Sequence, residues 1–232
     1  MKRLTALITA TAITLSGAAM ANDKSDSANE AASFLATYEV TVTNLTKGQY
    51  FTPLIVATHS PRIRMFMVGE APSDALSRIA EGGATDEMAM ALADSGMGYD
   101  IQFSTNGLIG PGESRTVTVE ANLRRYNRVS LAGMLLPTND TFVALDALRL
   151  EKHMTQQTAY ANAYDAGSEM NDESCAHIPG PIECGGVGQP FSVGLAEGYV
   201  YPSPGIHGMG DLDPAMYDWR GPVAMVKVVR ID

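Results

Sequence analysis

The stretch RTVTVEA, from Arg115 to Ala121, alternates between polar and apolar residues along almost its whole length. Successive side chains of a β-strand point to opposite faces, so the valines and the alanine fall on one face and the threonines and the glutamate on the other. This pattern predicts a half-buried strand. It is typical of antiparallel sheets, which commonly pack one face on a core and expose the other.

Segments on both sides of this stretch carry related patterns. Tyr38–Asn44 (YEVTVTN) alternates in the same way, whereas Arg128–Leu136 (RVSLAGMLL) is more continuously apolar, as expected of a central strand. The Gly and Pro between Leu45 and Ile55 indicate a connection between strands. Further strands are predicted at Tyr99–Ser104, Leu145–Leu150 and Val223–Ile231.

Two short helices are expected between the strands. Pro72–Ala80 has Ser73 as a candidate N-cap and Gly82 as a stop, and Asp86–Asp94 has Thr85 as its candidate cap. Six or seven strands with turn residues between them therefore predict an all-β fold: an antiparallel β-sandwich with short helical inserts.

The first residues have the features of a secretory signal peptide. Lys2 and Arg3 precede an apolar run that ends in Ala19-Met20-Ala21, a small-x-small cleavage pattern. A membrane anchor is the alternative, but threonine, serine and glycine interrupt the run. We expect residues 1–21 to be a signal peptide, 22–35 a flexible leader and 36–232 the folded domain. The mature protein is then exported to the periplasm, the cell surface or the medium, and we predict no transmembrane segment in it.

The composition limits the possible partners. The chain has 232 residues, 45% of them hydrophobic, which is enough apolar surface for a sizeable core. Its formal net charge of −10, from 16 Lys+Arg against 26 Asp+Glu, argues against nucleic acid as a partner. Cations, surface glycans and other proteins are the expected partners.

The two cysteines, Cys175 and Cys184, lie in a segment rich in glycine and proline. In an oxidising compartment, a pair with no cysteine left over is most simply one disulfide. A metal site that also uses His177 is the alternative.

Acidic residues gather between Thr138 and Glu173. Asp140 directly follows a predicted strand, and Asp165 and Glu169 flank Gly167, where a tight turn could aim both carboxylates at one point. Carboxylates that converge from two loops at a sandwich end suit Ca²⁺, which takes six to eight oxygen ligands in irregular geometry. On spacing alone, a solvated acidic loop remains the alternative.

Several stretches resemble the spondin amino-terminal domain family in its short bacterial secreted form. The Asp-Ala-Gly-[Ser/Thr]-[Glu/Asp] motif at Asp165–Glu169 is fairly specific, and its combination with the other stretches is more so. Together the matching stretches place most of the chain from about Tyr38 to Asp232 in the resemblance; they are Tyr38–Gln49, Leu54–His59, Met134–Asp140 and Tyr164–Glu173.

The resemblance implies a sandwich like the calcium-dependent membrane-binding domains of synaptotagmin-type proteins. It also implies a non-enzymatic adhesion or binding module, since animal members have extracellular matrix and adhesion roles. Carried over to this sequence, the family's calcium ligands fall on Asp140, Asp165 and Glu169. Glu169 is a departure, because animal members have aspartate there. Animal members also carry further modules, such as thrombospondin repeats, which this chain lacks.

Two other classes of function stay open at this point. No Gly-x-Ser-x-Gly nucleophile motif occurs, so we predict no catalytic residues, but a metal-assisted hydrolase could use the same acidic rim. The Met65/Met67 and Met88/Met90 pairs could serve a periplasmic copper-handling protein, although methionine more often fills a core. His59 ends an apolar run and is expected to be packed or hydrogen-bonded.

Overall fold

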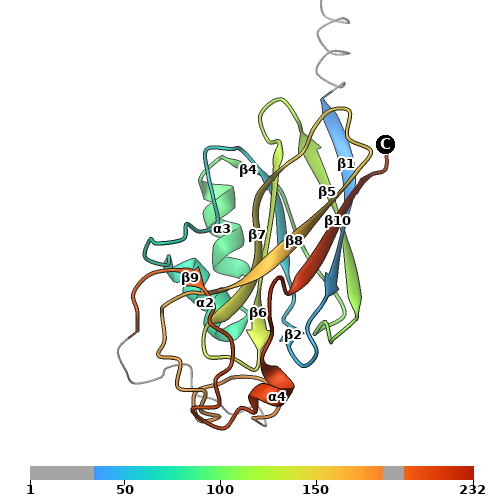
Figure 1. The fold of residues 1–232 in the computed structure, drawn as a ribbon. Helices are drawn as coiled ribbons and strands as arrows, with labels where there is room; N and C mark the ends of the chain where they lie inside the picture. The colour runs from blue at the N-terminus through green and yellow to red at the C-terminus, as the bar shows by residue number, and fades with distance from the viewer. Residues whose placement is uncertain (1–33, 185–195) are drawn as a thin grey trace, which may run out of the picture. The chain divides into compact units, whose positions relative to one another are not determined.

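Strands dominate the computed structural model, which describes residues 34–184 and 196–232 (Figure 1). The predicted signal peptide and nearly all of the predicted leader lie outside the described residues. Residues Phe34–Asp232 form one compact unit. The described part holds ten strands and three short helices: β1 (Leu35–Asn44), β2 (Tyr50–Phe51), β3 (Ile55–His59), α2 (Asp74–Gly82), α3 (Asp86–Asp94), β4 (Gly98–Phe103), β5 (Ser114–Asn122), β6 (Arg128–Leu136), β7 (Thr141–Arg149), β8 (Gln156–Asp165), β9 (Tyr201–Pro202), α4 (Pro214–Tyr217) and β10 (Ala224–Arg230).

The strands form two layers joined by one long strand. One layer has the order β5-β1-β10-β8 and the other β8-β7-β6-β3-β4, and every pair is antiparallel. β8 belongs to both layers because its residues 156–161 pair with β10 and its residues 162–165 pair with β7. The all-β fold predicted from the sequence is confirmed.

The alternating strands bury one face between the layers. In β5, Val117, Val119 and Ala121 are buried, and they share one hydrophobic core with Val40 of β1 and Leu131 of β6. β6 is buried at eight of its nine positions, as expected of a strand with β3 on one side and β7 on the other. The central-strand prediction for Arg128–Leu136 is therefore confirmed.

The two helices α2 and α3 pack on the outer face of β3, β6 and β7, where Leu76 and Ile79 join Ala132 and Phe142 in a second core. Ser73 caps α2 as predicted, since its side chain accepts from the backbone N–H of Leu76. The helix ends at Gly82, two residues later than predicted, because the left-handed C-cap is Gly83 and not Gly82. Thr85 makes no capping hydrogen bond.

Five strands differ most from the sequence prediction, and two of them, the two-residue strands β2 and β9, were not predicted. Ile55 belongs to β3 and not to a connection, and β7 begins at Thr141 rather than Leu145. β8 was not predicted at all. Its buried positions near the acidic end are held by Ala161 and Ala163, which lack the β-branched or aromatic character that predicts strands. In the described residues, no helix is long and apolar enough to span a membrane.

Candidate functional site

Asp140 and Asp165 lie together at one end of the sandwich. Pairing of β7 with β8 sets Thr141 opposite Asp165, so the connection that follows β6 runs beside the end of β8. The backbone N–H of Ala166 donates to the carbonyl of Asp140 (3.1 Å). Both aspartates are fully buried. Asp165 is the last residue of a strand, which corrects the expectation that both carboxylates come from loops.

The carboxylate of Asp140 holds the turn that contains Gly167. Its Oδ2 accepts from the backbone N–H groups of Ser168 (2.8 Å) and Glu169 (2.9 Å). Its Oδ1 is buried and has no hydrogen-bond partner within residues 34–184 and 196–232. Burying a carboxylate oxygen without a donor is costly in free energy. A ligand bound at this oxygen would explain why it is buried.

Asp165 is better satisfied by its neighbours. Its Oδ1 accepts from the backbone N–H of Gly167 (2.8 Å), and its Oδ2 accepts from the side-chain amide of Asn171 (2.7 Å). The same amide lies 3.1 Å from the hydroxyl of Tyr201. These contacts tie the end of β8 to the following segment and to β9.

Burial disfavours the charged form of both aspartates. Burial, with a smaller contribution from the charge of Asp165, raises the pKa of Asp140 to about 7. Burial also raises the pKa of Asp165 to about 6, although the donors from Asn171 and Gly167 oppose this shift. Burial and the nearby Asp165 raise the pKa of Tyr201 as well. A cation beside these groups would favour the ionised form of both aspartates.

Glu169, the third predicted ligand, is also buried, and its backbone N–H binds Asp140. Within the described residues, however, no three His, Cys, Asp or Glu side chains form a group that could hold a metal ion. The structure thus brings Asp140 and Asp165 together and places the Glu169 backbone beside them. It does not arrange all three carboxylates around one point.

Glu173 is a buried carboxylate whose role the sequence analysis missed. Its Oε1 accepts from the backbone N–H of His207 (2.5 Å). Its Oε2 accepts from those of Gly208 (2.7 Å) and Met209 (2.8 Å). The acidic run had indicated a polar loop, but nothing in it predicted contacts with residues more than thirty positions away. Glu173 therefore anchors the loop before α4.

The disulfide between Cys175 and Cys184 is present, with a Cα–Cα distance of 4.8 Å, as predicted. His177 does not join the cysteines in a metal site. Its Nδ1 lies 2.5 Å from Oδ2 of Asp172, whose Oδ1 accepts from Asn139 (2.9 Å). These contacts connect the disulfide loop to the segment that carries Asp140.

The histidine and methionine expectations can be compared with the structure in the same way. His59 is fully buried, its Nδ1 donates to the carbonyl of Ser60 (2.9 Å), and its Nε2 lies 2.7 Å from the hydroxyl of Ser130. The prediction that His59 is packed and hydrogen-bonded is confirmed, and burial lowers its pKa. Each Met-x-Met pair has one member in the core, Met65 and Met88, and one exposed member.

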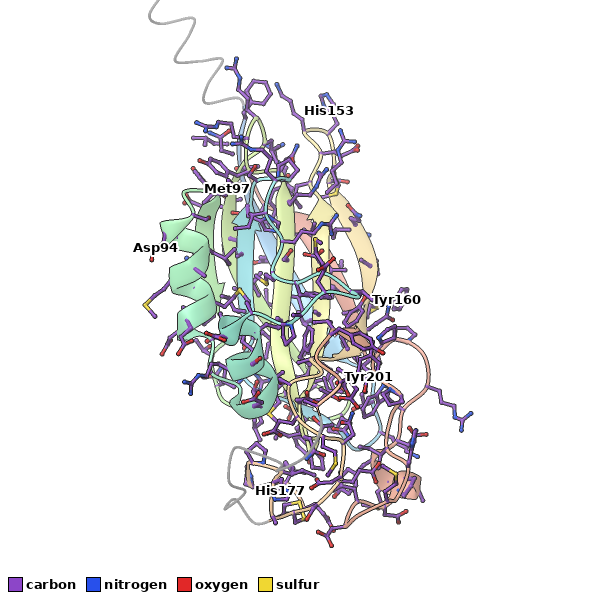
Figure 2. The ribbon with its side chains drawn as sticks, turned by 90° about the vertical axis from the view of Figure 1, so that its left-hand side faces the viewer. Asp94, Met97, His153, Tyr160, His177 and Tyr201 are labelled. Carbon is purple, nitrogen blue, oxygen red and sulfur yellow. A yellow bond between two sulfur atoms is a disulfide. The ribbon has the colours of Figure 1, made fainter. Side chains whose placement is uncertain are left out.

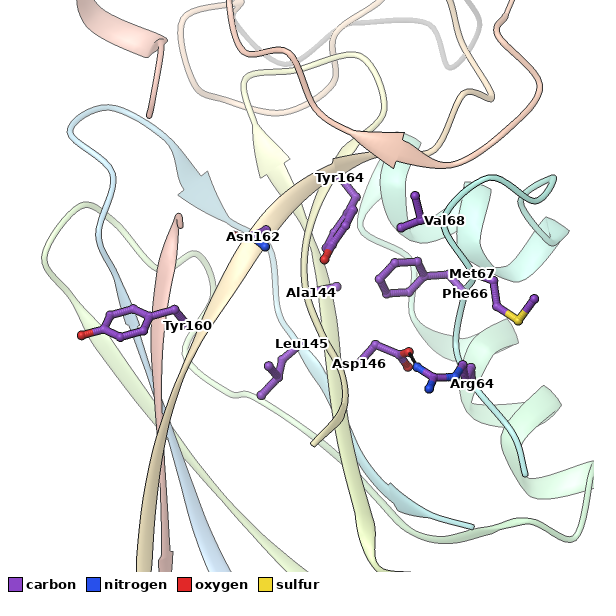
Figure 3. A pocket seen from close by; sticks show the side chains of 10 residues that line it. All are labelled: Arg64, Phe66, Met67, Val68, Ala144, Leu145, Asp146, Tyr160, Asn162 and Tyr164. Atoms are coloured by element: carbon purple, nitrogen blue, oxygen red, sulfur yellow. Dashed lines mark hydrogen bonds and ion pairs between the residues drawn. The ribbon is translucent and has the colours of Figure 1, made fainter. Parts of the chain in front are cut away.

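A hollow of about 450 Å³ lies beside the acidic end, where β7 and β8 meet the loop before α2 (Figure 3). Phe66 and Tyr164 form one wall, with ring centroids 4.9 Å apart. The side chains of Asn162 and Tyr164 make no hydrogen bond with the described residues, so both are available to a ligand. Arg64 and Asp146 also line it and pair with each other, which leaves the hollow without net charge.

Gly167 is required where it stands. It has a φ of +65°, and a Cβ atom there would lie 2.3 Å from the carbonyl oxygen of Tyr199. We expect Gly167→Ala to lower the free energy of unfolding by at least about 2 kcal/mol, because strain and overlap add. Gly107→Ala is the matched control: its φ is +72°, but nothing lies within 4 Å, so strain alone should cost about 1 kcal/mol. Equal losses in urea unfolding would contradict the close approach.

The family model Spondin_N matches residues 33–174, from just before β1 to just after the acidic segment. The resemblance noted in the sequence had been expected to reach Asp232, but the match ends before the disulfide. None of the curated proteins matches the chain. Spondin amino-terminal domains are a family of extracellular-type binding modules, not of enzymes, and the disulfide is compatible with export. Because the match covers more than half of its length, the chain belongs to the spondin amino-terminal domain family.

Proposed function

We propose that this protein is a secreted adhesion module whose acidic end is ordered by Ca²⁺. One observation carries the calcium part: the buried Oδ1 of Asp140 has no donor and lies beside a second buried carboxylate. Calcium would supply the positive charge that balances the two buried carboxylates. Asp140 and Asp165 would provide carboxylate oxygens, and the Gly167 turn keeps Glu169 near them.

The donor set fits a hard cation. Ca²⁺ binds oxygen ligands only, accepts backbone carbonyls and water beside carboxylates, and tolerates irregular geometry. Two aspartates are few for a protein site, so carbonyl groups, water or a moved Glu169 side chain would complete it. The metal would have a structural and not a catalytic role. It would relieve the repulsion between Asp140 and Asp165 and so stabilise the segment from 166 to 173.

Thermal unfolding of the mature protein in EGTA and in Ca²⁺ tests the calcium proposal. At a free concentration one hundredfold above the dissociation constant, Ca²⁺ should stabilise the fold by about 2.7 kcal/mol. Asp165→Asn should remove most of this gain, because it deletes one ligand charge. Asp94→Asn, at the exposed end of α3, is the matched control and should keep it. A wild type that does not respond to Ca²⁺, and that carries no metal by elemental analysis, would refute the calcium site.

We place the adhesive contact at the hollow of about 450 Å³ that Phe66, Asn162 and Tyr164 line. Because it has no net charge, it is called the neutral hollow. Its aromatic wall and its free amide and hydroxyl groups suit a neutral sugar residue of a surface glycan, and its volume lies within the roughly 300–1,000 Å³ of small-molecule sites. This supports a glycan rather than a protein partner.

Titrations with the neutral oligosaccharides maltohexaose, cellohexaose and chitohexaose test this contact. Asn162→Ala and Tyr164→Phe each remove one free hydrogen-bonding group, so each should weaken binding of a recognised sugar about fivefold or more. Thr158→Ala changes the exposed face of β8 outside the hollow and should bind normally. If none of the three sugars binds to the wild type, or if all three variants bind alike, the hollow is not a saccharide site.

A further inference from the structure

The arginines without a carboxylate partner gather at the other end of the sandwich. Six of the ten arginines in the described residues form ion pairs with Asp or Glu. The four that form none are neighbours in space or sequence: Arg62, Arg124, Arg125 and Arg128. In a chain with 26 acidic residues, guanidinium groups without a carboxylate partner that are concentrated in one place require an explanation. Arg124 lies over the ring of Phe34 and Arg128 donates to the carbonyl of Asn127, and neither contact neutralises the charge.

Three of these arginines line a hollow of about 230 Å³ in which no lining residue is Asp or Glu. Arg62 comes from the segment after β3, and Arg124 and Arg125 come from the connection between β5 and β6. Arg128 follows directly as the first residue of β6. Met97, which also lines the hollow, and His177 of the disulfide loop lie at opposite ends of the molecule (Figure 2). The hollow and the Asp140 site are separated by the length of β6, roughly 27–30 Å.

The backbone that carries these arginines is ordered by its own hydrogen bonds. Asn122 accepts from the backbone N–H of Arg124 through its side chain (3.2 Å) and from that of Tyr126 through its carbonyl (2.7 Å). Across the hollow, the backbone N–H of Ser60 donates to the carbonyl of Met97 (2.8 Å). The arginines thus project from an ordered backbone, so binding would cost little backbone entropy beyond that of ordering the side chains.

An aromatic surface lies beside the arginines. The ring of Tyr126 stacks on Tyr99 with centroids 5.2 Å apart and an interplanar angle of 24°. Arg125 lies over the Tyr126 ring, 5.6 Å from its centroid. Aromatic faces contact sugar rings, and guanidinium groups bind sulfate, phosphate or carboxylate oxygens in pairs.

We propose that this hollow, the arginine hollow, binds an anionic group of an acidic polysaccharide. A polymer with dense charge, such as nucleic acid, would meet the acidic remainder of the surface, whereas a polysaccharide spaces its anionic groups by sugar rings. One such group can occupy the arginine hollow while a neighbouring ring contacts Tyr126. The inference goes beyond the proposed function, since it involves neither the calcium site nor the neutral hollow.

Calorimetric titration in EGTA at low salt tests the inference with κ-carrageenan fragments, which carry a sulfate on alternate sugars, alginate fragments for carboxylate and dextran as the uncharged polymer. At least one acidic polymer should bind and dextran should not, and affinity should fall as salt rises. The double variant Arg124→Ala/Arg125→Ala should lose at least roughly tenfold in affinity. Arg220→Ala is the matched control, because Arg220 is exposed, pairs with Asp218 and lies outside the hollow, and it should bind like the wild type.

Several results would overturn the inference. They are failure of both acidic polymers to bind, an equal loss in Arg220→Ala, or tighter binding of a single-stranded DNA oligonucleotide than of either polysaccharide. Inorganic sulfate and phosphate, titrated separately, show whether a free ion alone accounts for binding, in which case the polysaccharide assignment is wrong. Because EGTA is present throughout, failure of the calcium proposal leaves this result unchanged, and failure here leaves the calcium test unchanged.

Discussion

Replacing Phe142 with alanine is expected to lower the free energy of unfolding by about 3–5 kcal/mol. Phe142 lies in β7 and is fully buried. It belongs to the second core, between the β8-β7-β6-β3-β4 layer and the helices α2 and α3. Its ring meets Phe66 edge-on at 5.1 Å and lies 5.8 Å from Tyr164. Alanine would leave a void that the strand cannot close, since Ala144 and Ala132 nearby are too small to fill it.

Phe103→Ala is the matched control for this substitution. Phe103 ends β4 and is 42% exposed, so its loss should cost less than about 1 kcal/mol. Urea unfolding of both variants measures the difference, with an unchanged slope as the sign that the folded state is intact. A Phe142→Ala variant as stable as Phe103→Ala would mean that the helices do not pack on β7. The aromatic wall of the neutral hollow would then lack its support.

The strands that alternate strongly could be predicted from the sequence, and those that do not could not. β1, β5 and β10 each bury two valines at alternating positions, so the local residue order alone predicts which face of each strand is buried. β8 contributes alanine to the core, and its remaining positions are polar or tyrosine, a composition that fits a loop equally well. Its assignment depends on pairing with β7, the preceding strand, and with β10, which is far away in sequence.

The candidate site could likewise be predicted from the sequence only in part. Residue type and the family resemblance both predict a site at Asp140 and Asp165, and β7–β8 pairing does bring them together. The sequence could not show that Asp140 keeps one oxygen without a donor, because that depends on where each backbone N–H of the Gly167 turn points. Nor could it show the arginine hollow, since Arg62 and Arg124 meet only after β3 and β6 pair.

Replacing Glu173 with alanine is expected to lower the free energy of unfolding by about 2–3 kcal/mol, because charge-assisted hydrogen bonds to three backbone N–H groups disappear. The effect stays below the sum of three buried bonds because residues 207–209 are exposed and water can replace the carboxylate. Glu173→Gln should lose most of the same energy, since its amide group would direct N–H groups against N–H donors. Glu151→Ala, an exposed surface change, is the control.

The place at which Glu173→Ala loses structure shows whether Glu173 anchors one segment or stabilises the whole fold. Glu173 is the last residue but one of the family match, whereas the residues that it holds lie well beyond the match. Ile178, Ile206, Leu212 and Tyr217 form a small core of their own there. If Glu173 joins this addition to the sandwich, limited proteolysis of Glu173→Ala should cut first near residues 205–212, while the strands stay protected. Cleavage at the wild-type rate would show that the small core and the disulfide hold the segment without Glu173.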